Sequence, residues 1–130
     1  MIPEDLKYSR THEWARLEAG NVVTMGITAF AVEQLGDIVF LDLPKAGTAT
    51  RQGQPMGVIE SVKAAVDLYA PVTGEVVQSN SALSANFDLL SQDPFGQGWM
   101  VKIKVADASA LSGLLSADQY RKHLEEEPTH

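Results

Sequence analysis

The chain contains no cysteine among its 130 residues. This absence excludes disulfide bonds, thiolate metal sites and a thiol nucleophile supplied by the protein itself. If the protein takes part in thiol chemistry, both sulfur atoms must come from an attached group. The lack of competing thiols would also spare such a dithiol from unwanted exchange.

Basic residues are also scarce. The sequence has 10 Lys and Arg against 17 Asp and Glu, which gives a formal net charge of −7. Proteins that bind nucleic acid cluster Lys and Arg against phosphates, whereas the basic residues of this chain are scattered. The composition therefore argues against a nucleic-acid partner. An acidic surface keeps a small protein soluble and can steer it toward basic docking faces on enzymes.

Long hydrophobic runs are missing as well. No apolar run approaches the roughly 20 residues that are needed to cross a bilayer. Residues 1–5 are acidic and lack the basic-then-apolar order of a secretory signal or the Arg-rich character of a transit peptide. We expect a cytoplasmic protein with no membrane partner, and a processed organellar protein is the alternative.

The sequence that remains is typical of one globular domain in length and composition. Its apolar runs are short, rich in β-branched residues and bounded by turn residues, which is typical of strands. We expect strands over residues 12–18, 21–27, 37–43, 57–60, 66–70, 74–78 and 99–105. The last of these alternates most clearly, with Trp99, Val101, Ile103 and Val105 on one face.

Helical segments are fewer. Thr28 can cap a helix over residues 29–35, which Gly36 would end. Residues 79–98 predict an ordered loop with a helical turn, and Asp107 can cap another short helix. Near the carboxyl end, Ser116 and Gln119 form a capping box, which predicts a helix over about 117–126.

Lys63 lies in a short polar segment, 60–65, between two strand-like runs. This order predicts a β-hairpin, and the absence of Asn-Gly or Gly-Gly at the tip favours a longer, type I-like turn. An enzyme that transfers an acyl group needs an exposed amine on a rigid support. Lys63 is therefore a candidate for carrying a covalent prosthetic group.

Six segments of the chain resemble the H protein of the glycine cleavage system, which carries lipoate on one lysine. Their order and spacing match that family throughout, and most of them lie outside the hairpin. The segments are Tyr8–Trp14, Gly26–Thr28, Leu35–Phe40, Gly57–Ala64, Tyr69–Val76 and Asp93–Trp99.

The resemblance implies a mainly β fold, a barrel-sandwich hybrid of two small antiparallel sheets with short helices and a C-terminal helix. It implies one lipoyl-carrier domain over residues 1–130, with lipoate attached to Lys63. The carrier would take the aminomethyl group of glycine from the pyridoxal-phosphate-dependent glycine decarboxylase (P protein) to the tetrahydrofolate-dependent aminomethyltransferase (T protein). Dihydrolipoamide dehydrogenase (L protein) would then reoxidise it, and lipoate-attaching enzymes would be further partners. Such a carrier is not an enzyme, because the cofactors do the chemistry, and we expect it to be a monomer.

Within that resemblance, two carboxylates are candidates for sheltering the loaded arm. The aminomethyl group carries an ammonium, and an unpaired buried charge is costly. Glu13 and Asp67 are acids beside aromatic or apolar residues in the matching segments, so we expect them to pair with this cation.

Other kinds of site find little support in the sequence. The histidines lack the spacing of metal ligands, and the serines lack the partners of a hydrolase, so we expect no metal site and no catalytic residues. A related lipoyl carrier for lipoate relay or for another lipoate-dependent system is the main alternative, and a small enzyme or a structural module are others. A biotin carrier fits poorly, since biotinyl lysines lie between methionines. The lipoyl domains of 2-oxo acid complexes usually have Asp before the lysine, where this chain has Val62.

Overall fold

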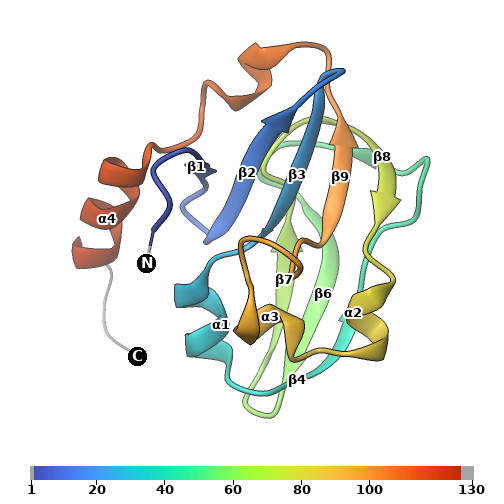
Figure 1. The fold of residues 1–130 in the computed structure, drawn as a ribbon, viewed down its shortest axis with the longest axis vertical. Helices are drawn as coiled ribbons and strands as arrows, with labels where there is room; N and C mark the ends of the chain where they lie inside the picture. Colours follow the sequence, from blue (N-terminus) through green and yellow to red (C-terminus); the bar gives the residue numbers. More distant parts are fainter. Residues whose placement is uncertain (1, 127–130) are drawn as a thin grey trace.

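Two antiparallel sheets of unequal size form the framework of the molecule (Figure 1). The computed structural model describes residues 2–126. The larger sheet has the strand order β1-β2-β3-β9-β8-β5, and the smaller has the order β4-β6-β7. The strands are β1 (Lys7–Tyr8), β2 (Glu13–Glu18), β3 (Val22–Ile27), β4 (Ile38–Asp42), β5 (Ala49–Thr50), β6 (Pro55–Ser61), β7 (Ala65–Tyr69), β8 (Gly74–Ser79) and β9 (Val101–Lys104).

Short helices lie between the strands, and a longer one follows them. They are α1 (Ala29–Leu35), α2 (Ala82–Ala85), α3 (Leu89–Gln92), the 3-10 helix η1 (Ala108–Leu111) and α4 (Ala117–Glu126). The predicted class, mainly β with two antiparallel sheets, short helices and a helix near the carboxyl end, agrees with this arrangement. The sheets differ in size more than the expectation of two small sheets suggested. Two of the extra strands, β1 and β5, have only two residues each, which is too short to produce a period in the sequence.

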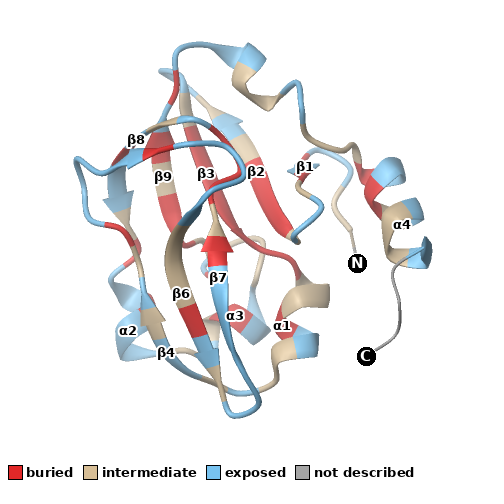
Figure 2. Cartoon of the chain, turned by 180° about the vertical axis from the view of Figure 1, so that it is seen from behind, coloured by how far each residue is buried: buried red, intermediate tan, exposed pale blue. Residues whose placement is uncertain are grey.

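The main core fills the space between the two sheets. Val23, Met25 and Ile103 from the larger sheet and Ile59 and Leu68 from the smaller one are all almost wholly buried. Figure 2 shows this as red bands across β2, β3 and β9 and at one end of β7, whereas the loop between β6 and β7 is exposed. The scaffold is therefore packed beneath an exposed hairpin tip.

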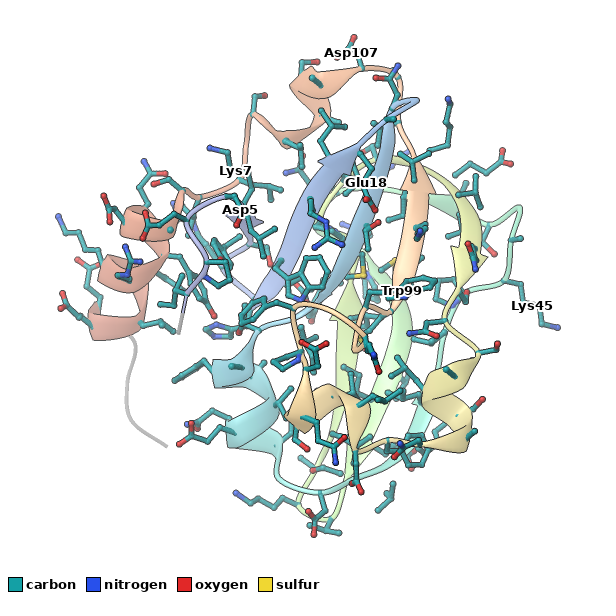
Figure 3. The ribbon with its side chains drawn as sticks, in the orientation of Figure 1. Asp5, Lys7, Glu18, Lys45, Trp99 and Asp107 are labelled. Atoms are coloured by element: carbon teal, nitrogen blue, oxygen red, sulfur yellow. The ribbon has the colours of Figure 1, made fainter. Side chains whose placement is uncertain are left out.

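The prediction that Trp99 lies on the buried face of the last strand is wrong. Val101, Ile103 and Val105 are buried as expected, but Met100 is buried too and Trp99 is only partly buried. The reason is that Trp99 belongs to a turn, in which its backbone N–H donates to the carbonyl of Gly96 at 3.1 Å. Its ring lies outside the sheet, 5.1 Å from Lys102 Nζ (Figure 3).

The loop over residues 79–98 contains two helical turns, α2 and α3, where the sequence predicted one. Asn80 holds this loop, because its side-chain amide donates to the carbonyls of Gln97 at 3.0 Å and Trp99 at 2.8 Å. A buried amide with two such partners stabilises a loop without any regular pattern in the sequence. The loop is ordered, as expected.

Helix α4 begins at the predicted capping box. Gln119 N donates to Ser116 Oγ at 3.2 Å, and Ser116 N donates to Gln119 Oε1 at 2.9 Å. The helix packs on a second apolar cluster beside β1 and β2, away from the main core (Figure 1). This cluster consists of Leu6, Tyr8, Trp14, Ala117 and Tyr120.

We expect Gly57→Ala to destabilise the protein by about 1–3 kcal/mol, because an added Cβ would lie 2.3 Å from the carbonyl oxygen of Asp42 in the neighbouring strand. Gly113→Ala is the matched control, since a Cβ there meets only the flexible end of Gln52, at 3.2 Å. Urea unfolding of both variants tests this. Equal midpoints for the two variants would contradict the close approach of β4 and β6.

Candidate functional site

Lys63 lies at the exposed tip of the β6–β7 hairpin. Ser61 N donates to the carbonyl of Ala64 at 2.8 Å, which closes the turn. Ser61 Oγ accepts from the backbone N–H groups of both Lys63 and Ala64, each at 3.1 Å. A serine hydroxyl can replace a backbone acceptor in this way, so the tip is rigid without glycine.

The tip is also fastened to the rest of the small sheet and to α1. Val62 N donates to the carbonyl of Asp37, just before β4, at 3.0 Å. The Lys63 amine donates to the carbonyl of Gln34, in the last turn of α1, at 3.4 Å. Unpaired carbonyls at a helix C-terminus attract cations. The lysine side chain therefore lies across the end of α1.

A groove of about 560 Å³ runs between α1, the β6–β7 hairpin and the segment before β2. Its volume is within the range of sites for small organic ligands, roughly 300–1,000 Å³. Gln34, the hydrogen-bond partner of Lys63, is one of its lining residues. The others are Arg10, Thr11, His12, Glu13, Ile27, Phe30, Ala31, Leu35, Ile59, Ala65, Val66, Asp67 and Tyr69.

Glu13 is a buried carboxyl in this groove, with an exposed fraction of 2%. Its Oε1 accepts from the hydroxyls of Ser9 and Thr11, both at 2.5 Å, and its Oε2 accepts from the backbone N–H of Tyr69 at 3.3 Å. Burial outweighs these hydrogen bonds and raises the pKa of Glu13 from 4.5 to about 7. Without a partner, the charged form of Glu13 is disfavoured by burial. A cation that entered the groove would therefore stabilise the Glu13 carboxylate.

Asp67 lines the same groove from β7 but is exposed. It lies between Lys63 and Tyr69, whose N–H bonds to Glu13. A strand rises about 3.3 Å per residue, so β7 from Ala65 to Tyr69 is roughly 13 Å long. The structure thus places the two predicted acids in one groove, and Lys63 adjoins that groove through its contact with Gln34.

Lys63 is the single Lys or Arg in its part of the sequence, although Arg10, from the segment before β2, also lines the groove. No Lys or Arg other than Lys63 occurs between Arg51 and Lys102, and none occurs between Arg16 and Lys45. These two stretches contain α1, β4, the hairpin, α2 and α3. Cations such as Lys7 and Lys45 project from other parts of the surface (Figure 3).

The described residues, 2–126, hold no group of three or more His, Cys, Asp or Glu side chains that could bind a metal ion. The same residues include no helix that is both long and apolar enough to cross a membrane.

The sequence did not indicate the hydrogen-bond partners of Glu13. Ser9 and Thr11 bond to Glu13, and Tyr69 supplies it with a backbone N–H. A local signal was present, since hydroxyls stand four and two residues before the acid. The contribution of Tyr69 carried no such signal, because it depends on how β7 packs on the larger sheet.

The model of the family described as "Glycine cleavage H-protein" matches residues 6–127. The chain belongs to this family. It is 52% identical to a glycine cleavage system H protein of Cyanothece sp. over 123 residues, which cover 95% of both chains. The corresponding protein of Cronobacter sakazakii is 51% identical over 126 residues, which cover 97% of this chain and 98% of that one.

The fold is shared with a member of known structure. The crystal structure of a glycine cleavage system H protein from Mycobacterium marinum superposes with a TM-score of 0.88 at 35% identity, covering 95% of this chain and 99% of that chain. The resemblance seen in the sequence and the predicted fold class are confirmed.

Family membership defines the role of the protein. It is a lipoyl carrier of the glycine cleavage system, it is not itself an enzyme, and its prosthetic group is lipoate held on a lysine. As a component of this system it has the P, T and L proteins as partners.

We expect Glu13→Gln to flatten the pH dependence of stability. The unfolded carboxyl loses its proton near pH 4.5 but the folded one only near pH 7. Between these values the unfolded state binds fewer protons, so the free energy of unfolding falls as pH rises. Relative to the variant, the wild type should lose about 3 kcal/mol across this window, with no further loss above it. Urea unfolding of both proteins from pH 4 to 8 measures this, and a constant difference would contradict the raised pKa.

Proposed function

We propose that Lys63 is the lysine to which lipoate is attached, in a single carrier domain formed by residues 1–130. The observation that carries this proposal is the exposed amine on a hydrogen-bonded hairpin tip, in a stretch of the chain, residues 52–101, that contains no other Lys or Arg. An attaching enzyme that docks on this hairpin meets one amine. The ends of the proposed domain, residue 1 and residues 127–130, lie outside the described residues.

The groove is suited to receive the arm. Its near end is marked by Gln34, which already contacts the lysine amine, and its walls include the apolar side chains of Phe30, Leu35 and Ile59. Apolar walls favour the hydrocarbon part of the arm and exclude water from it. Lipoate, when bound, supplies a disulfide that accepts the aminomethyl group and that is afterwards reoxidised.

Glu13 and Asp67 then hold the ammonium of the cargo. The exposed carboxylate of Asp67 attracts the cation at modest cost, whereas the buried carboxyl of Glu13 gains most when a positive charge arrives. Ser9 and Thr11 keep the Glu13 oxygens in place by donating to Oε1. The chain thereby holds the labile group away from water while the carrier moves between enzymes.

The proposal also covers further partners, the oligomeric state and the location in the cell. Lipoate-attaching enzymes are further partners, the carrier acts as a monomer, and it works in the cytoplasm. The acidic residues around Lys63 support docking on enzymes with basic surfaces. A monomer is favoured because a carrier that visits several active sites must leave its tip uncovered. Sedimentation of the purified protein and fractionation of its native cell test the last two points.

We expect protein from a lipoylating host to gain the mass of one lipoyl group, and Lys63→Arg to lose it completely. Arginine keeps the charge but cannot form the amide under these conditions. Intact-mass spectrometry measures the gain, and Lys45→Arg is the matched control that should still be modified. A lipoylated Lys63→Arg protein would sink the proposed attachment site.

Glu13→Gln should shorten the lifetime of the aminomethyl group on the loaded carrier by roughly tenfold, because it removes a charged partner from the ammonium. Asp67→Asn should have a smaller effect, about twofold, since solvent screens an exposed pair. Release of formaldehyde and ammonia from isolated loaded protein measures the lifetime. Glu60→Gln is the control, because Glu60 belongs to the hairpin but not to the groove. If Glu13→Gln and Asp67→Asn both matched the wild type, sheltering by these acids would be wrong.

A further inference from the structure

The hydroxyl of Tyr120, in α4, lies between two walls of the groove. It is 2.8 Å from His12 Nδ1 and 2.8 Å from Thr28 Oγ1. His12 belongs to the segment before β2, and Thr28 caps α1 by accepting from Ala31 N at 3.3 Å. A single buried side chain from the carboxyl-terminal part of the chain therefore joins the two elements between which the groove opens.

Helix α4 holds the same wall at a second point. The His123 ring nitrogen Nε2 lies 2.9 Å from the carbonyl oxygen of Arg10. Since a carbonyl only accepts, the histidine donates this bond. His12 lies between Arg10 and Glu13 in the chain. Its backbone is strained, because it has a positive φ of 74°. A non-glycine residue in that region persists only where its surroundings hold it.

Tyr120 does not line the groove itself. Its effect on the groove is indirect, through His12 and Thr28. The wall that it fastens also carries Thr11, a hydrogen-bond donor of Glu13. A shift of this wall would therefore change both the width of the groove and the surroundings of its buried carboxyl.

We propose that Tyr120 is a positioning residue for the carrier function, and that α4 acts as a clasp that keeps the groove narrow enough to shelter the arm. The inference rests on the proposed placement of the arm in this groove. It assigns to the C-terminal helix, which is remote from Lys63 in the sequence, control over how long the cargo stays protected.

The stacked pair of Tyr8 and Tyr120 supplies a matched control. Their rings lie 4.6 Å apart and within 8° of parallel, so Phe at either position keeps the stacking. The Tyr8 hydroxyl instead donates to the carbonyl of Pro3 at 2.6 Å, away from His12 and Thr28. Tyr8→Phe and Tyr120→Phe thus each remove one hydrogen-bonded hydroxyl, but only the second touches the groove walls.

The first measurement uses the unmodified protein and needs no arm. We expect Tyr120→Phe to speed amide hydrogen exchange in residues 9–13 and 28–31 by about threefold to tenfold, the effect of losing one hydrogen bond. Tyr8→Phe should leave these amides unchanged. Equal exchange in both variants, or a uniform increase over the whole chain in Tyr120→Phe, would overturn the positioning role.

The second measurement uses the loaded carrier. The aminomethyl group should be lost to water about threefold to tenfold faster from Tyr120→Phe than from the wild type or Tyr8→Phe. If Tyr120→Phe matched a wild type that is itself protective, the clasp would be refuted while the proposed sheltering stood. If the wild type lost the group as fast as free aminomethyl-lipoamide does, the sheltering would fail and this inference with it.

Discussion

A carboxyl group buried in a groove with partly apolar walls is the constraint on which the proposed carrier site depends. Glu13 begins β2, and its carboxyl receives two donors from the preceding segment and one from β7. Burial raises its pKa to about 7, so the empty site holds it in a state where charge is costly. In the proposed role of Glu13, a positively charged cargo offsets that cost, and the fold favours a loaded arm over an empty one.

The rest of the molecule places this carboxyl in the groove and the lysine beside it. The core between the two sheets fixes β7 against β2, and the serine-based turn fixes the tip. The prosthetic group must move, whereas the support beneath it must not. A rigid hairpin with one exposed amine meets both demands, because the motion is left to the flexible bonds of the arm.

Local features of the site could be predicted from the sequence. The hairpin around Lys63, the span of α1 and the capping box of α4 all depend on residues that are neighbours in the chain. The raised pKa of Glu13 could not be predicted, because it comes from burial of the carboxyl, which depends on segments far apart in the sequence. The contact of Tyr120 with His12 and Thr28 is similar, since it spans 92 residues or more. Trp99 was placed on the wrong face because a turn interrupts the alternation that was read as a strand.

The charge of Lys63 among acidic neighbours affects how partner enzymes approach the protein. Acylation at the proposed site converts the Lys63 ammonium into a neutral amide, so the formal net charge goes from −7 to −7 − 1 = −8. Residues 52–101 then carry no positively charged side chain. An enzyme that attaches the group and an enzyme that uses it consequently meet two different electrostatic faces on one scaffold. The loss of this charge strengthens the attraction of the hairpin face for basic docking surfaces.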